Sequence, residues 1–153
     1  MDAATAALLG AAISGVVALG GQVVGGWLAY SRQRGQSRNE RLGRFMASAQ
    51  GYIMAVGQVA RSQEGRKDEL EQELIWTYMD SVDMALAEIK LHDPRQVVEA
   101  AVDLDRALGE LIGEARKKQF SREDWRTVRD PITKGKMERF NEAARAAMKK
   151  VFQ

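Results

Sequence analysis

The stretch AATAALLGAAISGVVALGGQVVGGWLAYS, residues 3–31, carries no charged side chain over 29 consecutive positions. An α-helix rises about 1.5 Å per residue, so ~20 residues cross the ~30 Å hydrocarbon core of a bilayer. The run is therefore long enough to span a membrane with some tilt. It predicts a transmembrane anchor within residues 1–31, and this anchor decides how the remainder of the chain is interpreted.

The two flanks of the run differ in charge, which predicts its orientation. Its N-terminal flank offers Asp2 and no basic residue, whereas a cluster of arginines follows its C-terminal end, opposed only by Glu40. By the positive-inside rule the C-terminal side is cytoplasmic and the N-terminus lies outside. Aromatic side chains at the membrane surface and basic side chains beside anionic headgroups would anchor this end. The expected interfacial anchors are Trp27, Tyr30, Arg32, Arg34, Arg38, Arg41 and Arg44.

Two other interpretations of the run compete with a membrane span. A secretory signal peptide needs a basic segment before its apolar stretch, and this chain has none. The stronger competitor is a buried helix in a soluble all-α oligomer, because the run is rich in Ala and Gly rather than in Leu and Phe. Soluble helices seldom continue this far without a charge, so the membrane span remains the leading interpretation.

Small residues on one face of the run predict self-association. Gly21 and Gly25 form a small-xxx-small pair, with Gly15 and Ala18 near it and Gln22 beside it. Such faces let two helix backbones approach closely in lipid, and an amide can hydrogen-bond across the contact. We therefore expect a homo-oligomer. A pore lined by such spans is an alternative, in which Ser14 and Gln22 would be the polar residues of the channel.

After the run, the pattern predicts a basic stalk helix over residues 32–66 that continues the anchor. Its apolar residues recur at spacings of three and four, which fits either a short coiled-coil seam or a stripe facing a bundle. Ser62, Gly65 and several charges predict that the helix ends near residues 61–66. The stripe consists of Leu42, Phe45, Ala49, Tyr52, Val56 and Val59.

Residues 67–153 predict a cytoplasmic antiparallel bundle that packs with the stalk helix. One helix is expected over residues 67–92, with Tyr78, Val82, Leu86 and Ile89 among its inward residues. Asp93 as N-cap and Pro94 as first residue would open the next helix, which runs to about Gln119. Ser121 with Asp124 resembles a capping box for a further helix. Asp130-Pro131 then predicts either a kink or the start of another helix.

Composition excludes several kinds of site. The chain has no cysteine and one histidine, so disulfides, thiolate nucleophiles and sites needing two histidines from one chain are impossible. No Glu-x-x-His pair or phosphate-binding Gly-rich loop occurs, and we expect no enzyme activity, metal or cofactor. Charge is arranged in blocks: residues 32–67 carry a net +6, residues 68–114 a net −10, and residues 115–153 a net +7. The blocks favour contacts with membrane or protein over nucleic acid.

The segment Gly25-Gly26-Trp27-Leu28-Ala29-Tyr30-Ser31-Arg32-Gln33-Arg34 follows an Ala/Gly/Val-rich run. Over about the first 45 residues the chain resembles small actinobacterial and actinophage proteins with one N-terminal span, an Arg/Gln-rich stalk and a helical tail. The resemblance implies an anchor and a helical cytoplasmic domain, and no activity. The leading hypothesis is a non-enzymatic, single-pass scaffold of the cell membrane that presents its helices to a cytoplasmic protein partner. A pore-forming assembly and a soluble all-α oligomer are the alternatives.

Overall fold

In the described part of the chain, helices form where the sequence spaces apolar residues by three and four. The computed structural model describes residues 37–149, which are helical apart from short connections and contain no strand. The all-α prediction is therefore confirmed for this part of the chain. The predicted span at residues 3–31 lies outside the described residues, and no helix within residues 37–149 is long and apolar enough to cross a bilayer.

The helix at residues 37–61 presents the predicted apolar stripe to the core. Phe45, Ala49, Val56 and Val59 are completely buried, and Leu42 and Tyr52 are nearly so. All six belong to the same core cluster as buried residues between Ile75 and Ala147, so the stripe faces a shared core. The helix ends at residue 61, within the predicted boundary, and the hydroxyl of Ser62 donates to the carbonyl oxygen of Val59.

The second helical segment is continuous from residue 64 to residue 92 and contains a π-helical turn. It consists of α2 (Glu64–Leu70), the π-helix η1 (Glu71–Ile75) and α3 (Trp76–His92). Val82, Leu86 and Ile89 are buried as predicted. The prediction that Tyr78 points inward is wrong, because 37% of this residue is exposed. Its ring lies over Gly51, whose missing side chain leaves room for the ring at the edge of the core.

Helix α4 (Arg95–Lys117) supplies the centre of the core, with Leu104 and Leu111 fully buried. The prediction that Asp93 caps this helix is wrong. Pro94 occupies the N-cap position without a side-chain cap, and Asp93 is the C-cap of α3. The Asp93 carboxylate instead accepts hydrogen bonds from Arg41 and forms an ion pair with Arg38, because a guanidinium is a stronger partner for a carboxylate than a neutral backbone N–H.

Helix α5 (Arg122–Lys149) runs through Asp130-Pro131 without a break, so no new helix begins there. The predicted capping box is present in a variant form: the Asp124 N–H donates to Ser121 Oγ, and Ser121 Oγ donates to the Asp124 carboxylate. Pro131 has no N–H for the ladder. Two residues later, the buried Thr133 donates its hydroxyl hydrogen to the carbonyl oxygen of Arg129 over 3.0 Å.

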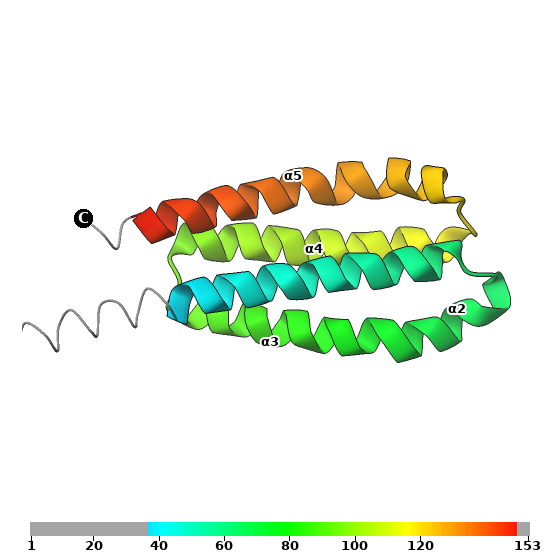
Figure 1. Cartoon of the computed structure of the whole chain (residues 1–153), viewed down its shortest axis with the longest axis horizontal. Coiled ribbons are helices and arrows are strands. Elements are labelled where there is room, and N and C mark those ends of the chain that lie inside the picture. Colours follow the sequence, from blue (N-terminus) through cyan, green and yellow to red (C-terminus); the bar gives the residue numbers. More distant parts are fainter. Residues whose placement is uncertain (1–36, 150–153) are drawn as a thin grey trace, which may run out of the picture. The chain divides into compact units, whose positions relative to one another are not determined.

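The helices lie side by side in the part of the chain from residue 38 onward, which we call the helical unit (Figure 1). Contacts at one end of the unit join Arg38 to Asp93 and to the carbonyl oxygen of Ala147. At the other end, the Phe120 N–H donates to the carbonyl oxygen of Ala60 over 2.9 Å. The core between these ends includes the tilted ring pair Phe45–Phe140, with centroids 5.0 Å apart.

Candidate interaction surface

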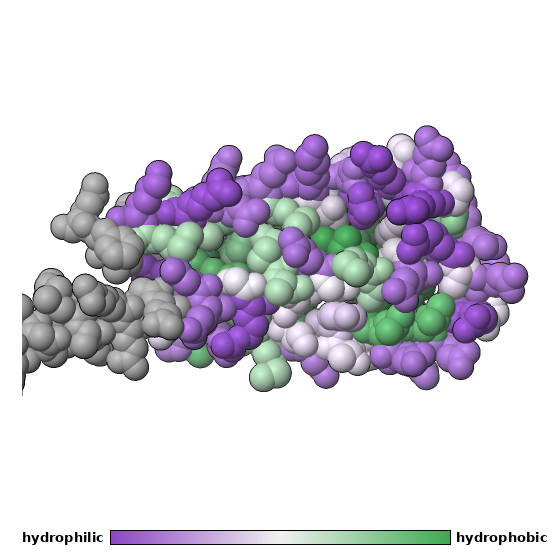
Figure 2. All heavy atoms as spheres, in the orientation of Figure 1, coloured by the Kyte–Doolittle hydropathy of each residue, from purple (hydrophilic) through white to green (hydrophobic). Residues whose placement is uncertain are grey.

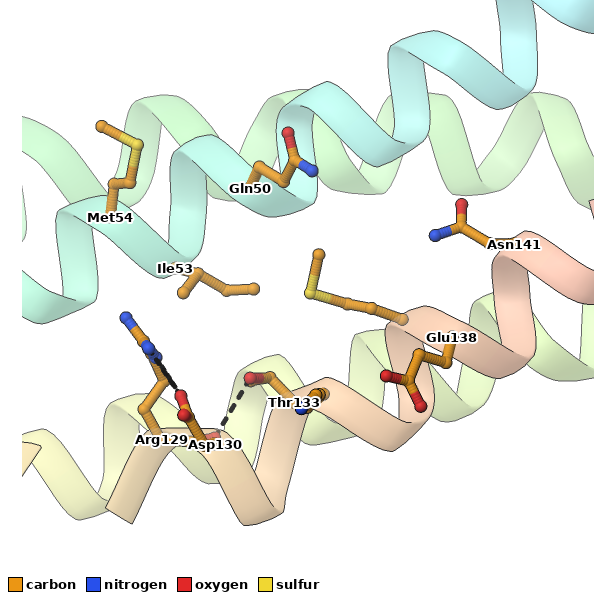
Figure 3. A pocket seen from close by; sticks show the side chains of 10 residues that line it. Gln50, Ile53, Met54, Arg129, Asp130, Thr133, Glu138 and Asn141 are labelled. Carbon is orange, nitrogen blue, oxygen red and sulfur yellow. Dashed lines mark hydrogen bonds and ion pairs between the residues drawn. The ribbon is translucent and has the colours of Figure 1, made fainter. Parts of the chain in front are cut away.

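A groove runs along the seam between the 37–61 helix and α5. Three hollows of about 550, 360 and 170 Å³ follow one another along this seam and share lining residues. The groove extends from Asn39 and Met148 at one end to Arg61 and Trp125 at the other. Figure 3 shows its middle section, which is lined by Gln50 and Ile53 of the 37–61 helix and by Thr133 and Asn141 of α5.

The groove is apolar at its floor and lined by methionines. Ile53 and Phe140 close it toward the core. Of the seven methionines in the chain, four line the groove, and this share makes its walls adaptable, since an unbranched thioether fills irregular gaps. Figure 2 shows pale and green side chains gathered between purple rows on this face. The four are Met46, Met54, Met137 and Met148.

The rim of the groove is polar and carries a surplus of positive charge. Asp130 pairs with Arg129, and the hydrogen bonds from this guanidinium lower the pKa of the Asp130 carboxyl. Glu138 is the other acidic residue of the rim. Against these two stand four basic residues, of which Lys134 and Arg145 form no ion pair within the described residues. The rim therefore favours an occupant with acidic side chains.

Helix α3 carries a second apolar stripe that points away from the core. Trp76, Met84 and Leu91 are 55%, 69% and 77% exposed. Spacings of eight and seven residues are close to whole numbers of turns, so the three side chains lie within ~80° on one side of the helix. We call these three residues the outer stripe. Helix α3 therefore has apolar residues on two faces, and the helical unit covers only one of them.

The predicted interfacial anchors divide into two groups. Trp27, Tyr30, Arg32 and Arg34 lie outside the described residues, as do the predicted self-association residues of the span. Arg38, Arg41 and Arg44 are described, and all three pair with acidic residues of the helical unit. Their contact with headgroups stays a prediction.

Two of these arginines form a clamp on a buried carboxylate. Arg38 Nε lies 3.1 Å from Asp93 Oδ1, and Arg41 Nε lies 3.3 Å from Asp93 Oδ2. The Asp93 side chain is fully buried, whereas the two arginine side chains are 22% and 17% exposed. Arg44 pairs with Glu88 nearer the surface, over 3.0 Å. The clamp ties the start of the described chain to the connection between α3 and α4.

At the other end of the helical unit, a buried lysine plays a structural part that the sequence did not reveal. Lys67 donates to the carbonyl oxygens of Ala115 and Lys118, over 3.0 and 2.7 Å. These carbonyls belong to the C-terminal end of α4, where a cation satisfies groups that the helix leaves unpaired. Nearby, Arg116 pairs with Glu71 of the π-turn, and burial raises the pKa of Tyr52 to about 12.

Comparison with known proteins identifies no relative. The chain matches no family model, and neither the curated proteins nor the solved structures contain a significant match. Among residues 37–149, no group of three or more His, Asp and Glu side chains lies close enough together to hold a metal ion. The groove and the outer stripe each combine apolar side chains with charged neighbours, a composition also found where amphipathic helices dock in grooves.

Proposed function

We propose that the protein is a non-enzymatic, single-pass membrane scaffold that self-associates, with its N-terminus outside the cell. The proposal rests on one observation: an uncharged run of 29 residues, 3–31, is followed at once by a cluster of arginines. This cluster begins at Arg32 and continues into the helix at residues 37–61. In this proposal the described helices act as an antiparallel bundle on the cytoplasmic face. Arg32 and Arg34 would contact anionic headgroups.

The role of the 37–61 helix in the core supports this proposal. The helix supplies Phe45, Val56 and Val59 to the core, and its first described turns are held by the Asp93 clamp. A helix buried in this way is part of the folded unit. Joining an anchor directly to such a helix suits a protein that holds a binding surface at a membrane.

Carbonate extraction of membranes tests the anchor. The full chain should stay in the membrane pellet after a carbonate wash. Replacing Leu19 and Val23 together by Arg should release it, because each arginine at the centre of a span costs ~2.5–3.5 kcal/mol of insertion free energy. The matched control replaces the same two residues by Ile and should stay in the pellet. Release of the unmodified chain would refute the membrane proposal.

Cysteine labelling tests the orientation without interference, because the chain has no native cysteine. A cysteine at Ala4 should react with an impermeant maleimide in intact cells, and one at Gln153 should react only after permeabilisation. The opposite labelling pattern would overturn the proposed orientation.

A reporter of span association in bacterial membranes tests self-association through the run. Replacing Gly21 and Gly25 together by Ile should weaken the signal while leaving insertion intact, since Ile is more apolar than Gly. The control is the pair Val16→Ile and Val17→Ile, which leaves the glycines in place. An unchanged signal at equal expression would show that the glycines do not form the contact.

A further inference from the structure

The outer stripe of α3 is flanked by acidic residues that the helical unit leaves unpaired. Glu73, Asp80 and Asp83 are exposed, and none of them forms an ion pair within residues 37–149. Glu73, in η1, precedes Trp76 by one turn, and Asp80 and Asp83 lie between Trp76 and Met84, so acidic side chains flank the first half of the stripe. We call the outer stripe together with these acidic neighbours the ridge. An apolar ridge with acidic edges complements a groove that has an apolar floor and a basic rim.

The groove between the 37–61 helix and α5 matches this ridge in chemistry and in length. Its floor is apolar, its walls carry Met54 and Met137, and its rim offers Lys134 and Arg145, which form no ion pair with residues 37–149. From Trp76 to Leu91 the ridge is ~22 Å long, and from Asn39 to Arg61 the groove is ~33 Å long, at about 1.5 Å per residue. The groove therefore accommodates the whole ridge.

We propose that α3 of one copy docks in the groove of a second copy of the chain. Every copy carries both surfaces, and their opposite charges follow the division of the sequence into acidic and basic blocks. If each copy inserts its ridge in the groove of the next copy, the contact is heterologous and builds closed rings or open filaments, whereas reciprocal insertion between two copies gives a two-fold dimer. This inference rests on the self-association proposed above and adds a contact in the helical unit to the one proposed for the span.

Crosslinking between two single-cysteine variants of the full chain tests the contact directly. Met84→Cys labels the ridge and Met54→Cys labels the groove, and both positions are exposed. When the two variants are co-expressed with different tags, a short bismaleimide should join them at least fivefold more than it joins either variant to itself. The matched control pairs Met54→Cys with Gln96→Cys, an exposed position on α4 outside both surfaces, and should give only background.

Charge exchange tests whether the edges of the ridge face the rim of the groove. Asp80→Lys with Asp83→Lys on the ridge copy should reduce the crosslink at least fivefold. Lys134→Glu with Arg145→Glu on the groove copy should then restore at least half of it. None of these four residues forms an ion pair within the described residues, so circular dichroism should show an unchanged helix content in each variant.

The outcomes separate this inference from the proposed function. Carbonate extraction and light scattering of the detergent-solubilised chain report the anchor and the oligomer independently of the crosslink. An oligomer that gives no ridge-to-groove product above the control overturns the inference and leaves the scaffold proposal standing. A product formed mainly between two Met84→Cys copies also overturns it, because the stripes would then meet each other. A monomeric chain overturns both.

Discussion

Removing either side of the arginine clamp should destabilise the helical unit by unequal amounts, because the two sides differ in exposure. The Asp93 side chain is fully buried, whereas Arg38 and Arg41 keep about a fifth of their side-chain surface in water. If Asp93 is replaced by Ala, the two guanidinium groups can turn toward solvent. If both arginines are replaced by Ala, the carboxylate is left buried without a cation.

The magnitudes follow from what each variant leaves behind. Asp93→Ala removes charge-assisted hydrogen bonds that contribute about 1.5–3 kcal/mol, and part of this is recovered by hydration of the arginines. The double variant Arg38→Ala/Arg41→Ala leaves an uncompensated buried charge, which costs about 3–5 kcal/mol. It also removes the hydrogen bond from Arg38 to the carbonyl oxygen of Ala147. We therefore expect the arginine double variant to lose more free energy of unfolding.

Urea titrations of the full chain, followed by far-UV circular dichroism, measure both values. A triple variant that removes all three side chains serves as the internal control. It should be more stable than the arginine double variant, since it leaves no charge buried. A loss for Asp93→Ala equal to or greater than that of the arginine double variant would refute the assignment of Asp93 as the buried partner of the clamp.

Three further predictions concern the core, pH and helix glycines. Leu104→Ala should lower the free energy of unfolding by ~2–5 kcal/mol in urea titrations, because Leu104 is fully buried. Glu99→Ala removes only the exposed ion pair with Arg95 and should lower the free energy of unfolding by ~0.5 kcal/mol or less. Asp105→Asn should raise the melting temperature at neutral pH, because burial, followed by the charge of Asp83, raises the pKa of Asp105 above its ordinary 3.8. With a raised pKa in the folded state, the wild-type chain loses stability as the pH rises from 3.8 through that raised pKa. The higher melting temperature of the variant should therefore disappear below pH 3.8. A difference in melting temperature that does not change with pH would contradict this cause. Gly109→Ala should stabilise the chain by ~0.5–1 kcal/mol in the same titrations, and Gly57→Ala should stabilise it less, since the added Cβ would lie 3.1 Å from Trp125 Nε1.

The core faces of the helices could be predicted from periodicity alone. Burial of an apolar stripe is the main source of helix stability in a folded domain, so apolar side chains at spacings of three and four identify the buried face. This reasoning found Phe45, Val56 and Ile89, which are fully buried. It failed at Tyr78, because the absence of a side chain at Gly51, on another helix, determines where that ring lies.

The partners of charged residues could not be predicted in this way. Asp93 before Pro94 has the sequence pattern of a helix cap, yet its carboxylate is held by arginines 52 and 55 positions earlier in the chain. Lys67 lies at the boundary between the basic and the acidic block, and it caps a helix end that is 48 positions away. Local sequence reports which hydrogen bonds a residue can make with its neighbours. It does not report which charge a second helix brings close.

By itself, then, the sequence determined the all-α class, the buried stripes and the capping box at Ser121, because each depends on residues within one or two helical turns. Only the tertiary structure decided the Asp93 clamp, the Lys67 cap, the groove and the exposure of the outer stripe. Each of these depends on how one helix is rotated and shifted against another. The physical reason is that periodicity fixes which face of a helix is apolar, whereas the packing of all the helices together determines how much of that face is covered.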